Sequence, residues 1–166
     1  MPLWTIYHPP STFASPRTRK SLAQSITAIY TAAHLPAFYV NVLFIPVAAS
    51  SIYIGGVARP SQERSSNSSA NIGPDPTVPF IRITIQNIAR KIPDVSRRDR
   101  FLARVDGALK PFIADEGYDW EYSVAETSRD LWKIQGLVPP MAGSEAEAEW
   151  VRGNRAVEFE REKGGL

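Results

Sequence analysis

The sequence predicts an α/β (α+β) fold in which two tandem β-α-β units form one four-stranded sheet with two helices on one face. The first observation is a strand–helix–strand pattern in residues 1–46 that returns in residues 79–127, after a linker at 47–78. The second is that each unit needs a crossover, and right-handed crossovers make the two strands of a unit parallel. The third is that one chain leaves the other face of this sheet uncovered, which favours oligomerisation through that face.

The first unit begins with the alternating, aromatic and β-branched segment Leu3–His8, which predicts a strand. Ser15 and Pro16 are typical of a helix start, with serine as the N-cap and proline at the first helical position. The apolar side chains of this helix recur at three- and four-residue steps: Leu22, Ile26, Ile29, Tyr30 and Ala33. The nearly continuous apolar run Tyr39–Pro46 predicts a strand that is buried on both faces.

The linker is rich in Ser, Gly, Pro and Asn. Within it, Ser51–Ile54 predicts a short strand that ends at Gly55 and Gly56. Pro60–Pro76 has the composition of a mobile surface loop.

The second unit begins with Phe80–Ile88, which is predicted as a strand because isoleucines alternate with polar residues: Ile81, Ile83 and Ile85 against Arg82, Thr84 and Gln86. Ser96 is the predicted N-cap of the second helix, and Gly117 is its predicted terminator. The apolar face of this helix is formed by Phe101, Leu102, Val105, Leu109, Phe112 and Ile113. The fourth strand is predicted from the alternation of Trp120, Tyr122 and Val124.

Residues 1–127 are therefore the predicted domain, and residues 128–166 form a C-terminal tail that we expect to pack on the same or a neighbouring subunit. The sequence of this tail predicts a short helix near Arg129–Ile134. Ser144 and Glu147 have the spacing of a capping box, which predicts a brief second helix that carries Trp150.

Composition excludes several classes of function. The chain has no cysteine and only two histidines, which are far apart, so we expect no protein-held zinc. A net charge of +2 argues against a nucleic-acid partner. The sequence shows neither a bilayer-spanning apolar run nor a secretory signal, so we expect no membrane partner and a cytoplasmic location. The basic stretch Arg90–Arg104 fits either a solvated helix start or a wall that attracts a carboxylate substrate.

A repeated β-α-β unit with proline directly after the initiator methionine is the first feature of a family resemblance. Further segments that contribute to it are Trp120–Tyr122, Arg129–Lys133, Gly136–Pro140 and Gly143–Glu145. With these features the sequence resembles the tautomerase superfamily, and within it the branch of fungal-type relatives that includes cis-3-chloroacrylic acid dehalogenase. The resemblance implies a homotrimer with no metal or organic cofactor, which acts on small 2-oxo or unsaturated carboxylic acids.

The resemblance also implies roles for single residues. Pro2 falls on the amino-terminal proline that acts as general base or acid, Arg90 on the second of two strand-end arginines, and Tyr122 on a tyrosine of the last strand. Tyr30 stands where the dehalogenase has a histidine, and Asn87 stands where it has the first arginine.

The catalytic glutamate of the dehalogenase falls on Lys133 or Ile134, and neither side chain activates water. Dehalogenation by addition of water is therefore not expected. Lys133 is instead a candidate for binding the substrate with its positive charge, while Trp132 and Ile134 are candidates for excluding water from the pocket.

The same residues fit proton transfer next to a carbonyl group. Removal of Met1 leaves a secondary amine whose ordinary pKa is about 8, and burial or a nearby cation such as Arg90 would lower that pKa. Arg90 is suited to bidentate binding of a carboxylate. Tyr122 and Tyr30 are suited to donating hydrogen bonds to an enolate oxygen.

Each residue also has a purely structural interpretation. Pro2 is then a remnant of translation and Arg90 a surface arginine, while Tyr122 and Tyr30 pack in the core and Asn87 ends a strand. The leading functional hypothesis is a cofactor-independent tautomerase or isomerase. The alternatives are a hydratase, dehalogenase or decarboxylase of 3-substituted acrylic acids, and a non-enzymatic trimeric binding module.

Overall fold

The structure of the chain, a computed structural model, describes residues 2–61, 75–88 and 90–166. Most of the predicted loop Pro60–Pro76 therefore lies outside the described residues. Within the described part, no helix has both the length and the apolar character needed to cross a membrane.

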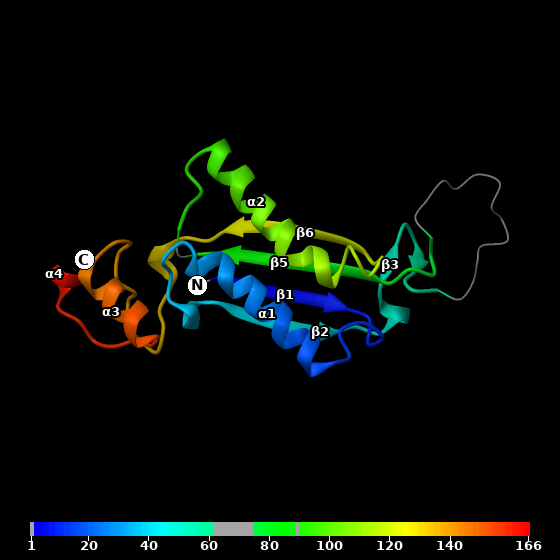
Figure 1. The fold of residues 1–166 in the computed structure, drawn as a ribbon, viewed down its shortest axis with the longest axis horizontal. Coiled ribbons are helices and arrows are strands. Elements are labelled where there is room, and N and C mark those ends of the chain that lie inside the picture. The colour runs from blue at the N-terminus through cyan, green and yellow to red at the C-terminus, as the bar shows by residue number, and fades with distance from the viewer. Residues whose placement is uncertain (1, 62–74, 89) are drawn as a thin grey trace.

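Four strands form the main sheet: β1 (Leu3–His8), β2 (Asn41–Pro46), β5 (Phe80–Asn87) and β6 (Asp119–Glu126). Their order is β2-β1-β5-β6. The two strands of each unit pair in parallel, and the two units join through an antiparallel pairing of β1 with β5. This arrangement confirms the predicted tandem β-α-β sheet (Figure 1).

The two long helices, α1 (Pro16–Thr31) and α2 (Val95–Leu109), cover one face of the sheet (Figure 1). Ser15 caps α1 as predicted. The prediction for α2 is wrong at both ends. Asp94 rather than Ser96 is the N-cap, because its carboxylate accepts a hydrogen bond from the Arg97 amide at 2.7 Å. The helix ends at Leu109 and continues as a 3-10 helix, so Gly117, with φ of 75°, belongs to the later turn before β6.

Alternate side chains of the central strands form the core against these helices. Trp4 and Ile6 of β1 are fully buried on the helix side, and the isoleucines of β5 extend the same layer. The layer is completed from the sheet and the helices by Ile81, Ile83, Ile85, Leu22, Ile26, Val105 and Leu109.

Strand β2 corrects the prediction that the run Tyr39–Pro46 is buried on both faces. The side chain of Leu43 is 47% exposed and that of Ile45 is 37% exposed. The reason is that β2 is an edge strand, and α1 covers only one face of the sheet. Tyr7 of β1, also 37% exposed, adds to this uncovered apolar surface.

The linker contributes a small separate hairpin. The predicted strand Ser51–Ile54 is present as β3 (Tyr53–Ile54), which pairs antiparallel with β4 (Val57–Ala58). The turn between them is formed by Gly55 and Gly56, at positive φ angles of 57° and 82° that glycine adopts without strain.

The tail lies beyond the end of the sheet where β1 and β2 begin and β5 and β6 end (Figure 1). The predicted helix near Arg129–Ile134 is only a 3-10 helix at Arg129–Leu131. Two further helices follow, α3 (Glu145–Gly153) and α4 (Arg161–Gly164). Trp150 of α3 is fully buried, and its ring lies 6.1 Å from that of Tyr39, so the tail packs on its own chain.

Candidate active site

Pro2 lies at the start of the central strand β1 and is buried. Its carbonyl oxygen accepts a hydrogen bond of 2.9 Å from the Asn41 amide. On the other side, Leu3 pairs with Gln86 in the antiparallel register, so the next position brings Pro2 opposite Asn87. The two edges of β1 therefore fix Pro2 between the beginning of β2 and the end of β5.

A cavity of about 250 Å³ opens beside this end of the sheet, between α1, the end of β5 and α2. Three of the predicted site residues line it together: Tyr30, Asn87 and Arg90. The cationic part of its wall consists of Arg90, Lys91, Arg97, Arg100 and Arg104. None of the described residues that line the cavity is acidic, so the cavity is suited to attract an anion.

Tyr30 reaches the cavity from α1, on the same side of the sheet as Trp4. The Trp4 indole nitrogen Nε1 donates a hydrogen bond to the Tyr30 hydroxyl at 2.9 Å. Burial raises the pKa of Tyr30 to about 12, against a smaller lowering by the bond from Trp4. The Tyr30 hydroxyl therefore stays protonated at neutral pH, and its own hydrogen is available for another acceptor.

The end of β5 positions Arg90. The side-chain amide of Asn87 donates to the Arg90 carbonyl oxygen at 2.9 Å, so Asn87 ends the strand and shapes the following turn. Glu126, at the end of β6, accepts a hydrogen bond of 2.6 Å from the Ile92 amide. These two bonds attach the backbone at Arg90 and Ile92 to the ends of β5 and β6.

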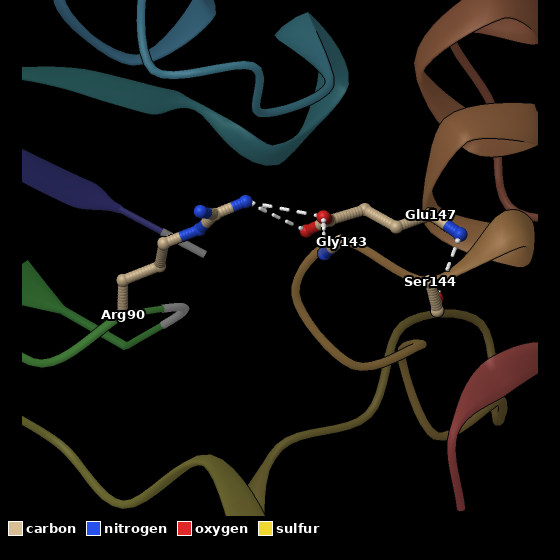
Figure 2. Close-up of polar contacts among 4 residues, drawn as sticks. All are labelled: Arg90, Gly143, Ser144 and Glu147. Carbon is tan, nitrogen blue, oxygen red and sulfur yellow. Dashed lines mark hydrogen bonds and ion pairs between the residues drawn. The ribbon is translucent and has the colours of Figure 1, made fainter.

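Glu147 binds Arg90 from the tail, a contact that sequence reasoning missed. Figure 2 shows the Arg90 side chain reaching across to the first turn of α3, where its Nη2 donates to Glu147 Oε1 at 3.2 Å and to Oε2 at 3.1 Å. The Gly143 amide donates to Oε2 at 2.6 Å. The Glu147 side chain is only 8% exposed, whereas that of Arg90 is 38% exposed.

Only one of the two hydrogen bonds of the predicted capping box is therefore present. Ser144 Oγ accepts the Glu147 amide at 3.1 Å as predicted. The Glu147 carboxylate does not reach back to the Ser144 amide, which bonds to the Met141 carbonyl instead. Glu147 precedes Trp150 by three residues, so both side chains lie on one face of α3. This spacing was the signal in the sequence that the carboxylate faces the protein interior.

Trp132 is 7% exposed and packs against Tyr39, with perpendicular rings whose centroids lie 5.0 Å apart. Ile134 is half-buried and forms an isolated bridge with Leu137. Lys133 is exposed. The structure thus places Trp132 and Ile134 on the tail side of the sheet end, and none of the three lines the cavity.

Tyr122 lies elsewhere in the chain. It pairs with Ile83 in the middle of β5, four residues before Asn87. Its hydroxyl donates to Asp106 Oδ1 of α2 at 2.9 Å. Burial, followed by the hydrogen bond and the charge of Asp106, raises the pKa of Tyr122 to about 12. One chain therefore does not bring Tyr122 together with Pro2 and Arg90.

Among the residues that the structure describes, no group of three or more histidine, aspartate or glutamate side chains is placed to hold a metal ion.

The sequence matches one protein-family profile over residues 1–155, and that family is described as "Putative oxalocrotonate tautomerase enzyme". The chain belongs to this tautomerase family. A comparison of this tautomerase-family chain with curated protein sequences gives no match.

Solved structures of similar proteins agree with the family. A variant of RhCC from Rhodococcus jostii RHA1 is 34% identical, with a TM-score of 0.84 over 98% of this chain and 96% of that chain. A protein described as "a probable enzyme from the thermophilic fungus Aspergillus fumigatus" is 43% identical, with a TM-score of 0.80 over 96% and 98%. An asymmetric trimer of a fused 4-OT protein shares the fold at 18% identity, with a TM-score of 0.54 over 82% and 94%.

Proposed function

We propose that this tautomerase-family protein is a cofactor-independent isomerase that acts on a small 2-oxo or unsaturated carboxylic acid. Its general base and acid is the amine of Pro2, freed by removal of Met1. The observation that carries the proposal is the position of Pro2, which is buried at the start of β1 opposite Asn87. Asn87 in turn lines a cavity with five cationic side chains.

The reaction that fits this site moves a single proton. In the ketonisation of an enol acid, the enol oxygen loses its proton and C3 gains one, so no other reactant is needed. The Pro2 amine takes up the proton and returns it to carbon, which is efficient when its pKa lies near the working pH. The nearby arginines hold the substrate carboxylate. The neutral Tyr30 hydroxyl stabilises the enolate oxygen by a hydrogen bond.

The direct test is the ketonisation of phenylenolpyruvate, followed by the loss of enol absorbance. We expect protein whose intact mass shows removal of Met1 to accelerate the reaction well above the rate in buffer. A matched sample that retains Met1 should be inactive, because its proline nitrogen is an amide and cannot act as a base. No acceleration by the processed protein would contradict the proposal.

The same preparation separates the alternatives. Release of halide from cis-3-haloacrylate would favour a hydratase or dehalogenase, and release of CO₂ from an acrylic or acetylenic acid would favour a decarboxylase. Binding of a carboxylate with none of these activities would favour a trimeric binding module.

We further propose that the protein is a homotrimer. The support is the uncovered sheet face, on which Tyr7, Leu43 and Ile45 leave apolar surface exposed, and the trimeric description of the fused 4-OT protein of the same fold. We expect native mass spectrometry to give about 55 kDa, three times the 18.4 kDa of one chain. A mass of one chain at micromolar concentration would overturn this assembly.

A further inference from the structure

Two aromatic side chains near the start of β2 present polar atoms that the protein itself does not use. Tyr39 is 1% exposed and Trp132 is 7% exposed. Within the described part of the chain, neither the Tyr39 hydroxyl nor the Trp132 Nε1 has a hydrogen-bond partner. Buried polar side-chain atoms are bonded in the large majority of cases, so two adjacent unused donors indicate a missing acceptor.

Arg90 adds a third donor. Its Nε is buried and also has no partner within the described residues, while its Nη2 is held by Glu147. Arg90 lines the cationic cavity as well, so it connects that cavity with the tail side of the sheet end. The Glu147 carboxylate accepts bonds from Arg90 and Gly143, but within the described residues it accepts none from the Tyr39 hydroxyl or the Trp132 Nε1.

These groups lie in one neighbourhood, because the Tyr39 and Trp132 rings are 5.0 Å apart and the charges of Glu147 and Arg90 act on Tyr39. Burial and then the negative charge of Glu147 raise the pKa of Tyr39, whereas the positive charges of Arg129 and Arg90 lower it by less. The Tyr39 hydroxyl therefore stays protonated and acts as a donor at neutral pH. Tyr39 also lies two residues before Asn41, whose amide bonds to Pro2, so this neighbourhood adjoins the proposed base.

We propose that Tyr39 Oη, Trp132 Nε1 and Arg90 Nε bind the carboxylate of the substrate, with Glu147 holding the Arg90 guanidinium in position. Three donors, one of them cationic, match the lone pairs of an oxyanion better than a neutral group. The remainder of the substrate then extends into the cationic cavity, which Arg90 also lines. This assignment rests on the proposed function for its substrate class, but it can be measured without turnover.

The experiment is a calorimetric titration with an unreactive probe, 3-phenylpropanoate, and with its neutral amide. We expect wild-type protein to bind the carboxylate, and Tyr39→Phe to weaken that binding by about tenfold because one hydrogen bond to a charged group is lost. The affinity for the amide should change little. Tyr53→Phe is the matched control, because it removes a hydroxyl from a tyrosine of β3 that is 59% exposed.

Trp132→Phe gives an independent second measurement, since it keeps an aromatic ring and removes Nε1. Loss of carboxylate affinity in either folded variant, with the amide unaffected, supports the site. Unchanged carboxylate affinity in both variants, or no binding of 3-phenylpropanoate to wild-type protein, overturns it and leaves these donors to bound water. Because the probe does not react, failure of the ketonisation assay with carboxylate binding intact rejects the enzymatic proposal and leaves the binding site standing.

Discussion

Replacing Pro2 with Ala is expected to lower kcat/KM for phenylenolpyruvate ketonisation by about a hundred- to a thousandfold, the size of a typical general acid–base contribution. The variant retains an α-amino group with an ordinary pKa near 8, so the loss reflects geometry more than basicity. The pyrrolidine ring fixes the direction of the nitrogen lone pair, whereas a primary amine rotates freely. The binding of an unreactive carboxylate should be nearly unchanged.

The measurement needs two controls. Intact mass must show that Met1 is removed from both proteins, because a retained methionine abolishes the amine in either one. Pro10→Ala is the matched substitution, since Pro10 is an exposed proline in the turn after β1, beyond the opposite end of that strand from Pro2. A Pro2→Ala variant that ketonises at the wild-type rate would exclude the amine as the base.

The sheet and its helices are predictable from sequence because their signals are local and periodic. Ile81, Ile83 and Ile85 alternate with polar residues in the third strand, and the helix after Ser15 repeats its apolar side chains at helical steps. The two errors in these predictions have different causes. Asp94 and Ser96 are both good caps, and only the bond to the Arg97 amide decides between them. An apolar run does not reveal whether its strand is central or at an edge, so the exposure of β2 was not predictable.

The candidate site was predictable only in part. Asn87 and Arg90 line one cavity with Tyr30 because the end of β5 and the helix α1 meet there. Pro2 lies opposite Asn87 because β1 and β5 pair in the antiparallel register. The strand pattern of one chain does not distinguish a catalytic Tyr122 from one that packs in the core. The contact of Glu147 with Arg90 was missed because the two residues are 57 positions apart, and the predicted capping box assigned the carboxylate to the Ser144 amide.

Removing Glu147 should lower both the stability of the protein and its affinity for the substrate. Glu147→Ala deletes the only described acidic partner of Arg90 and leaves the Gly143 amide without its acceptor. Breaking a buried pair by removing one partner costs about 3–5 kcal/mol, and partial exposure of the surviving Arg90 reduces this to about 2 kcal/mol. KM for the enol acid should also rise by about tenfold, because a free guanidinium no longer holds one orientation.

Comparing two variants of Glu147 separates the effect of its charge from the effect of its shape. Glu147→Gln keeps an acceptor for the Gly143 amide but removes the charge, so it should lose less stability than Glu147→Ala while raising KM similarly. Glu149→Ala is the matched control, because Glu149 is an exposed acid of the same helix. Urea unfolding and steady-state kinetics provide the two measurements. If Glu147→Ala were as stable as Glu149→Ala and had an unchanged KM, the ion pair would be incidental. The tail would then be held by the packing of Trp132 and Trp150 on Tyr39.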